Sequence, residues 1–200
     1  PHNQRIFRYL GEGKFKNVES PLVNWPISAR NAHQIMTLDL LFDKEIKMIS
    51  LTGPAGTGKT FLACAEALKM VKNHEFKQII LVKSVTQLKG EETGFLPGDL
   101  REKMEPWMQP IYSNFYQLYN KDKIDKILEN GQVEIVPLAF MRGMNIDNSI
   151  LIFEEAQNST PKQMKLLLTR IGFNSKFFIS GDLEQFDRHK DKKETGLWDA

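Results

Sequence analysis

A glycine-rich stretch constrains the fold of this 200-residue chain more than any other feature. Gly53–Thr60 reads GPAGTGKT and fits the pattern G-x-x-x-x-G-K-[ST] at every position. The run before it, Lys47–Thr52, is short and apolar like a buried strand, and apolar residues recur at helical spacing from about Gly58 to Val71. A strand, a glycine loop and a helix in this order form a phosphate-binding loop, so the sequence predicts binding of a nucleoside triphosphate.

Each residue type in this loop has a chemical task. Glycines allow the backbone to curl, so that its N–H groups point at anionic oxygens, and the helix N-terminus adds its positive dipole. Lys59 supplies a cation for the β- and γ-phosphates, and Thr60 supplies a hydroxyl for Mg²⁺. The flanking strand and helix disfavour a chance glycine-rich turn. We therefore predict ATP and Mg²⁺ as ligands, with contacts from Gly53, Pro54, Ala55, Gly56, Thr57, Gly58, Lys59, Thr60 and Phe61.

Five short apolar segments predict a parallel sheet. They are rich in Ile, Val, Leu and Phe and largely lack alternation with polar residues, as strands buried on both faces do. The segments between them are long enough for crossover helices, so the expected fold class is α/β, a mostly parallel sheet with helices on both faces. The predicted strands are Lys47–Thr52, Gln78–Lys83, Val133–Pro137, Ser149–Phe153 and Lys176–Ser180.

Two further helices have sequence signals. Ser28–Asp43 carries apolar residues on one side. Thr160 suits an N-cap, Pro161 the first helical position and Gln163 the third position of a capping box. We expect the helix that they open to end near Arg170.

Composition sets few limits on function. The net charge of +2 permits binding to a polyanion without arguing for it. The single cysteine, Cys64, excludes an internal disulfide and fits a reducing cytoplasm. No apolar run approaches the roughly 18 residues of a membrane helix, and the histidines lack metal-ligand spacing. We expect residues 1–27 to form an N-terminal arm of low structural content, and residues 28–200 to form one domain.

Two acids follow the predicted strand Ser149–Phe153. In phosphate-loop proteins a strand beside the loop ends in an acid that holds Mg²⁺, often through water, and a second acid polarises the attacking water. Glu154 and Glu155 match these roles in order, Glu154 for the metal and Glu155 as general base. The alternative is a solvated acidic strand end or a charge pair at a helix N-terminus. The complete phosphate loop earlier in the chain favours the functional interpretation.

The next strand also ends in polar residues. Ser180, Asp182 and Gln185 are candidates to contact the γ-phosphate and to respond to its loss. An ordinary turn explains the same residues equally well.

At this point the chain resembles the PhoH-like ATPase family, relatives of superfamily 1 helicases. The resemblance covers about residues 28–200, and the FLPGDL and MRG stretches are more specific than the phosphate loop alone. It implies a RecA-like core, ATP hydrolysis, ring-shaped oligomers (a hexamer is suspected) and a link to RNA metabolism. A PIN-type nuclease domain, present in some relatives, does not fit in this chain, which resembles short phage-encoded or stand-alone members. The matching stretches are GPAGTGKT (53–60), TGFLPGDLREKMEPWMQPIY (93–112), PLAFMRG (137–143), EEAQNSTPKQMKLLLTRIG (154–172), SGDLEQFD (180–187) and TGL (195–197).

The resemblance also implies residue roles. Gln34, three positions after Asn31, corresponds to the glutamine that binds the adenine edge. Ser180, Asp182 and Gln185 then fall at the strand end that senses the γ-phosphate. Arg142 and Arg170 are arginine-finger candidates, from the same or a neighbouring subunit. A structural ion pair is the alternative for each arginine.

Two positions depart from the family pattern. The family usually has Asp where this chain has Glu154, so the Mg²⁺ shell must readjust to a longer side chain, and turnover could be lower. Where the family tends to have Arg-Pro, this chain has Lys83 and Ser84. Lysine keeps the charge but loses the planar fork, which would weaken any contact with nucleic acid at this point.

Cations and aromatics gather between Lys83 and Tyr119. Such residues can bind single-stranded RNA or DNA through phosphate contacts and base stacking. The alternative is a helix face packed in the core or against a subunit, because the last four aromatics have helical spacing. Lys89–Gly94 reads as a loop that contacts a strand or a subunit. The residues concerned are Lys83, Lys89, Arg101, Lys103, Trp107, Tyr112, Phe115, Tyr116 and Tyr119.

Three functions remain open from the sequence. The first is an ATP-driven motor on single-stranded RNA or DNA, which with one RecA-like core requires a ring of subunits. The second is a binding or switch protein in which ATP orders an assembly surface without translocation. The third is a small-molecule kinase, disfavoured because no arginine-rich lid is present and the EEAQ strand end does not suit a kinase.

Overall fold

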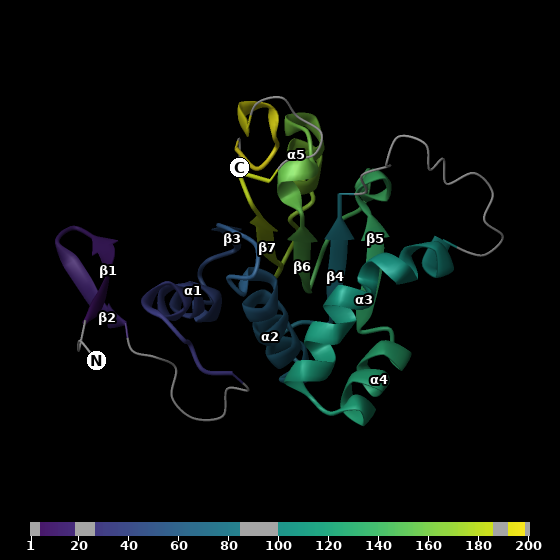
Figure 1. The fold of residues 1–200 in the computed structure, drawn as a ribbon, viewed down its shortest axis with the longest axis horizontal. Helices are drawn as coiled ribbons and strands as arrows, with labels where there is room; N and C mark the ends of the chain where they lie inside the picture. Colours follow the sequence, from purple (N-terminus) through teal and green to yellow (C-terminus); the bar gives the residue numbers. More distant parts are fainter. Residues whose placement is uncertain (1–4, 19–26, 85–99, 186–191, 199–200) are drawn as a thin grey trace.

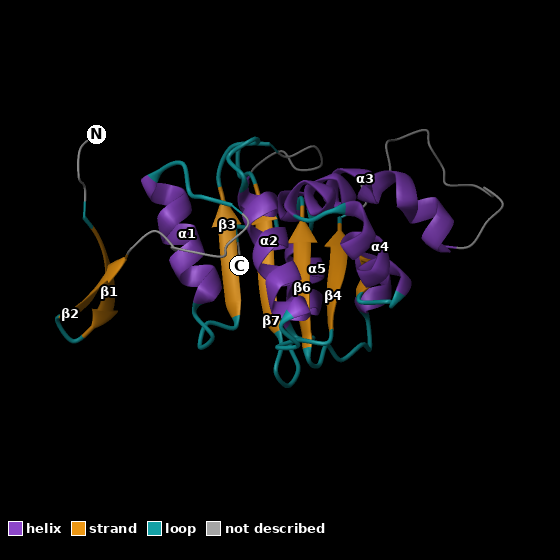
Figure 2. Cartoon of the chain, turned by 90° about the horizontal axis from the view of Figure 1, so that it is seen from below, coloured by secondary structure: helices purple, strands orange, loops and turns teal. Residues whose placement is uncertain are grey.

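A computed structural model describes residues 5–18, 27–84, 100–185 and 192–198 (Figure 1). Within these residues, a five-stranded sheet has the order β3-β7-β6-β4-β5, and all its neighbouring strands are parallel. The arrows point to one edge of the sheet (Figure 2), which therefore collects the carboxyl ends of the strands. All five predicted strands are confirmed: β3 (Met48–Thr52), β4 (Gln78–Lys83), β5 (Val133–Pro137), β6 (Ser149–Glu154) and β7 (Lys176–Gly181).

Helices cover both faces of the sheet. One face packs against four α-helices, and the other packs against a fifth α-helix and short 3-10 segments. The predicted fold class is confirmed: the arrangement is that of a RecA-like α/β core. The first group is α1 (Ala32–Phe42), α2 (Lys59–Lys72), α3 (Leu100–Leu118) and α4 (Lys121–Glu129), and the second is α5 (Pro161–Leu168), η1 (Leu138–Met141) and η2 (Ala156–Asn158), with η3 (Lys192–Glu194) near the end of the chain.

Strand β6 shows why the strands lack polar alternation. Ile150 and Ile152 pack into the cluster beneath α1–α4, whereas Leu151 and Phe153 pack into the cluster beneath α5. All four side chains are fully buried. Burying each one stabilises the fold by about 1.5–3 kcal/mol, so a central strand covered on both faces needs apolar residues at every position.

The order of the strands determines which strand ends lie at the phosphate loop. The strand that ends in Glu154 does not lie directly beside the strand that leads into the phosphate loop, because β7 lies between β3 and β6. Gly53 donates a backbone hydrogen bond to Gly181 at the end of β7, at 3.3 Å. The ends of β3, β7 and β6 therefore form one continuous row.

The helix signals in the sequence are confirmed. Asn31 caps α1, its side chain accepting from the backbone of Gln34. Thr160 and Gln163 form the predicted capping box of α5. That helix ends at Leu168, close to the expected boundary.

The expectation of low structural content is wrong for part of the N-terminal arm. Residues Ile6–Gly11 (β1) and Lys14–Val18 (β2) form an antiparallel hairpin. Its turn includes Gly11 and Gly13, both at positive φ, which glycine adopts readily. The sequence signal was a short run of strand-forming residues on each side of a glycine turn.

The aromatic face of α3 serves packing. Phe115 is fully buried, and Tyr112 and Tyr119 are partly buried against the same cluster. Tyr116 is more exposed, and its hydroxyl donates to Asp125 at 2.7 Å. The packing interpretation of this face therefore holds in place of base stacking. The Lys89–Gly94 segment and the side chains of Arg101, Lys103 and Trp107 lie outside the described residues. Among the helices described, none has the length and apolar character to span a membrane.

Candidate active site

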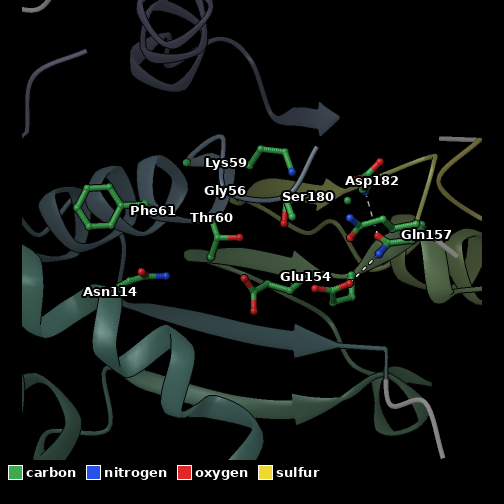
Figure 3. Close-up of a pocket in the computed structure, with 14 residues that line it drawn as sticks. Gly56, Lys59, Thr60, Phe61, Asn114, Glu154, Gln157, Ser180 and Asp182 are labelled. Carbon is green, nitrogen blue, oxygen red and sulfur yellow. Dashed lines mark hydrogen bonds between the residues drawn. The ribbon is translucent and has the colours of Figure 1, made fainter. Parts of the chain in front are cut away.

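A cavity of about 340 Å³ lies at the carboxyl edge of the sheet. Its wall brings together the start of α2, the ends of β6 and β7 and one residue of α3 (Figure 3). Ligands of open α/β sheets bind at this edge. The lining residues are Ala55, Gly56, Gly58, Lys59, Thr60, Phe61, Asn114, Glu154, Glu155, Gln157, Ser180, Gly181, Asp182 and Gln185.

The glycine loop has the backbone that its sequence requires. Gly56 and Gly58 have φ of 75° and 90°, in the region that residues with a side chain rarely adopt. The Thr57 hydroxyl donates to the Pro54 carbonyl at 2.9 Å, which holds the loop together. Helix α2 begins directly after Gly58, so its N-terminus points at the cavity.

Lys59 is partly buried at the start of α2. Its Nζ donates to the carbonyls of Gly53 and Pro54, at 2.6 and 2.8 Å. Burial lowers the pKa of Lys59, while the charges of Asp182 and Glu155 oppose the shift. A cation with little hydration in this position is suited to a phosphate oxygen.

Glu154 lies at the end of β6 and faces Thr60 (Figure 3). Burial raises the pKa of Glu154, and a hydrogen bond from Thr60 and the charge of Lys83 oppose the shift. Lys83 is its register partner on β4. The site therefore contains a carboxylate beside a hydroxyl, and both groups are oxygen ligands of the kind Mg²⁺ takes.

These two oxygen donors fit a nucleotide-bound Mg²⁺. In the described part of the chain, no three His, Cys, Asp or Glu side chains are grouped to hold a metal on their own. Mg²⁺ at nucleotide sites takes one or two protein ligands, with phosphates and water completing its shell. Thr60 and Glu154 would supply the protein ligands of such a shell.

Glu155 adopts a strained backbone at the cavity. Its φ and ψ are 54° and 39°, a left-handed conformation that is uncommon outside glycine. Gln157 Nε2 donates to Glu155 Oε2 at 2.7 Å. Gln157 Oε1 accepts from the backbone N–H of Asp182 at 3.1 Å, so one buried amide joins the ends of β6 and β7. Strain of this kind concentrates at functional sites.

Among the lining residues that have a side chain, two received no role from the sequence: Gln157 and Asn114. Gln157 is only 2% exposed, and its place directly after the paired acids was an available signal. Asn114 reaches the cavity from α3 (Figure 3). Nothing local in the sequence marks Asn114, because its position depends on how α3 crosses the sheet.

The predicted sensor residues lie at the same cavity. Ser180 and Asp182 are buried, and Gln185 is exposed at its rim. Asp182 accepts a hydrogen bond on Oδ1 from the backbone of Glu184, at 2.9 Å. The structure thus brings the three residues together with Lys59 and Glu154.

Gln34 lies beside the phosphate loop at a second cavity, of about 370 Å³. Its Nε2 donates to the Thr57 carbonyl at 3.1 Å, and its Oε1 accepts from the Arg30 backbone at 2.8 Å. A methyl group on Gly58 would lie 3.3 Å from Nε2, so the loop and the glutamine are closely packed. This position suits a residue that contacts the base of a nucleotide bound by the loop.

Neither arginine-finger candidate lines these two cavities. Arg142 is exposed and follows η1, which continues from the outermost strand β5. Arg170 lies at the opposite edge of the sheet, where its carbonyl accepts from Ile146, just before β6. Its guanidinium donates to the Met144 carbonyl and the Thr169 hydroxyl, at 3.4 and 3.2 Å.

A comparison with known families decides the relationship. A family model described as PhoH-like protein matches residues 26–200. The chain belongs to the PhoH-like family. The family resemblance inferred from the motifs is thereby confirmed, and membership agrees with a nucleotide-binding role for the cavity.

Curated relatives share the family name and are longer. A PhoH-like protein of Bacillus subtilis strain 168 is 48% identical over 141 residues, covering 70% of this chain and 44% of the relative. Protein PhoH of Escherichia coli K12 is 39% identical over 164 residues, covering 81% of this chain and 46% of the relative. Protein PhoH2 of B. subtilis is 38% identical over 179 residues, covering 86% and 40%. The chain therefore spans less than half the length of these PhoH proteins.

Proposed function

We propose that this PhoH-like chain hydrolyses ATP with Mg²⁺ and couples hydrolysis to the binding or translocation of single-stranded RNA or DNA. The observation that carries the proposal is the convergence on one cavity of Lys59, Thr60 and two consecutive acids, the last residue of β6 and the residue after it. A cation, a hydroxyl and a carboxylate at a helix N-terminus suit the Mg²⁺ complex of a triphosphate. A second carboxylate at the same cavity suits hydrolysis rather than binding alone.

Each residue has a distinct task in this reaction. The loop amides and Lys59 hold the β- and γ-phosphates, and Thr60 with Glu154 would hold Mg²⁺, which neutralises charge on the phosphates when bound. Glu155 accepts a proton from the attacking water as the water oxygen bonds to the γ-phosphorus. The bond from that phosphorus to the β–γ bridging oxygen breaks in the same displacement, so that ADP leaves with the bridging oxygen. Gln157 donates a 2.7 Å hydrogen bond to the Glu155 carboxylate, which holds the base in one orientation before the reaction begins.

The same amide offers a path for reporting the state of the nucleotide. The backbone N–H of Asp182 donates a hydrogen bond to Gln157 Oε1. Ser180 is the second-last residue of β7, two positions before Asp182. Loss of the γ-phosphate would remove a partner of these side chains. The resulting shift would pass along β7 and the loop toward Gln185.

A finger role for either arginine requires a ring of subunits. Because Arg170 lies at the edge of the sheet opposite the phosphate loop, it can act only on a nucleotide held by a neighbouring subunit. Arg142, exposed near the outer strand, is also placed for a neighbour. A finger supplied in this way would neutralise charge on the transferred phosphoryl group.

The test is the rate of Mg²⁺-dependent ATP hydrolysis with and without single-stranded RNA or DNA. We expect several-fold stimulation by one of them. Hydrolysis that is indifferent to both would favour the alternative, an ATP-dependent binding or switch protein without translocation. Absence of hydrolysis in Mg²⁺ would contradict the proposed activity. Light scattering with ATP tests the ring, because a strict monomer would exclude fingers acting between subunits.

A further inference from the structure

The N-terminal hairpin has two chemically different faces. Side chains alternate across a strand, and directly paired residues share a face. Tyr9 pairs with Phe15, and Phe7 pairs with Asn17, so the three aromatics share one face. Arg8 pairs with Lys16 on the other face.

The face with Arg8 and Lys16 docks on helix α1. Arg8 lies 3.2 Å from Asp39 and 2.8 Å from Asp43, and Lys16 lies 2.6 Å from Asp39. Val18, at the end of β2, is buried. Figure 1 shows the hairpin at one end of the molecule, beyond α1 and away from the sheet. These ion pairs fix which face of the hairpin is turned outward.

The outward face is an exposed aromatic surface. Phe7, Tyr9 and Phe15 are 56%, 61% and 64% exposed. The rings of Tyr9 and Phe15 lie 5.2 Å apart between centroids, so they form one continuous surface. A hairpin of two short strands gains little from leaving large rings in water, and exposed apolar patches commonly mark interaction sites.

The hairpin carries more basic than acidic residues. Residues 5–18 contain four basic residues and one acidic residue, Glu12. Arg5 is exposed, and the side chains of Lys14 and Lys16 remain 73% and 50% exposed although Lys14 pairs with Glu12 and Lys16 with Asp39. Aromatic rings flanked by cations are the arrangement that binds single strands by base stacking and phosphate contact. Arg8 and Lys16 are engaged by Asp39 and Asp43, so the remaining positive charge of the hairpin comes from Arg5 and from Lys14, which is 73% exposed. This charge favours a polyanion over a second copy of the same basic hairpin.

We propose that Phe7, Tyr9 and Phe15 form a base-stacking surface for single-stranded RNA or DNA. The identity of this ligand rests on the proposed function. Helix α1 connects the surface to the nucleotide site, since Asp39 holds the hairpin and Gln34, earlier on the same helix, donates to the Thr57 carbonyl of the loop. The same helix therefore contacts both the hairpin and the phosphate loop.

The experiment compares the affinity of the full chain for labelled oligouridylate and oligothymidylate by fluorescence anisotropy. The variant is Phe7→Ser/Tyr9→Ser/Phe15→Ser, and the control is Phe173→Ser, which replaces an 81% exposed ring elsewhere on the surface. Since each stacked aromatic contributes about fivefold or more, we expect the triple variant to bind at least tenfold more weakly. ATP binding and basal hydrolysis should stay at the wild-type level in both proteins.

The possible outcomes separate the two proposals. If wild type and triple variant bind the oligonucleotides equally well, the hairpin surface is excluded while the proposed function stands. If the wild type binds neither oligonucleotide, coupling to nucleic acid and the hairpin surface both fail. If the triple variant forms a smaller oligomer than the wild type but binds the oligonucleotides with the same affinity, the surface serves contacts between copies of the chain. This result would overturn the inference.

A second measurement does not depend on the folding of the variant. Wild-type chain is photo-crosslinked to oligouridylate that carries 4-thiouridine, and the modified peptides are mapped by mass spectrometry. Crosslinks at residues 5–18 are expected. Efficient crosslinks that all fall elsewhere would overturn the proposal.

Discussion

The side-chain amide of Gln157 donates a 2.7 Å hydrogen bond to the carboxylate of Glu155. The amide is buried and is held from its other side by the backbone of Asp182. Gln157→Ala should therefore release Glu155 and lower kcat for ATP by about tenfold or more, with little change in Kd for ATP. Single-turnover hydrolysis and nucleotide titration measure the two quantities. Gln78→Ala, at the start of β4, is the matched control.

Glu155→Gln tests the base itself. Glutamine keeps the size and the hydrogen-bonding capacity of the side chain but cannot accept the proton of the attacking water. Hydrolysis should fall by about 100-fold or more, while ATP binding is retained. Unchanged turnover would show that Glu155 is not the general base, and Glu154 would then be the remaining candidate for that role.

Lys59→Ala tests the phosphate loop. Loss of the cation should reduce turnover by about 100-fold or more, and thermal unfolding should change little because the side chain contacts only loop carbonyls. Lys72→Ala, in the last turn of the same helix, should hydrolyse ATP normally. Wild-type hydrolysis by the Lys59 variant would show that the reaction occurs elsewhere.

Gln34→Ala tests recognition of the base. On the proposed role, the variant loses the hydrogen bonds between the Gln34 amide and the edge of adenine. The Kd for ATP should therefore rise by about two- to tenfold, and the ratio of the Kd for GTP to the Kd for ATP should fall. His33→Ala, the exposed neighbour on α1, is the control. An unchanged preference would leave Gln34 as a structural support of the loop through Thr57.

Glu66 makes stability depend on pH. Its carboxylate is 2% exposed on α2, Oε2 has no hydrogen-bond partner, and Lys69 Nζ lies 3.8 Å away. Burial raises the pKa of Glu66 to about 7, with the charges of Lys69 and Lys176 opposing the shift. The pKa of Glu66 is higher in the folded than in the unfolded chain. Its contribution to the free energy of unfolding is therefore fully present below about pH 4.5, where the carboxyl is protonated in both states. This contribution is lost as the pH rises through about 7.

Glu66→Gln should remove this dependence. The variant should resemble wild type near pH 4 and be more stable by about 1–3 kcal/mol at pH 7.5. Urea unfolding at several pH values measures the difference, with Glu129→Gln at an exposed position as the control. A variant less stable than wild type at pH 7.5 would mean that the charged form of Glu66 is stabilised by its lysine neighbours.

The sequence predicted what local pattern determines. Gly53–Thr60 and the capping box at Thr160 depend on residues a few positions apart, and both were placed correctly. The apolar strands followed from burial on both faces. Their carboxyl ends then brought Glu154 and Asp182 to one edge without further assumptions.

The features that sequence did not predict depend on distant contacts. The insertion of β7 between β3 and β6 has no local signal, because parallel strands are joined by crossovers of any span. Asn114 reaches the cavity through the path of α3. The hairpin has a weak sequence signal because its two strands are short and partly polar, and its docking depends on Asp39, far along the chain.

The central position of β7 has a consequence for how the protein is made. Residues 176–181 complete the sheet between two strands that precede them in the chain, and Gly181 accepts the hydrogen bond that anchors Gly53. A nascent chain that ends before this segment carries the glycine loop without the wall that closes the cavity. On the proposed function, ATP would bind only chains in which β7 has joined the sheet, and this binding would draw late folding intermediates toward the native state.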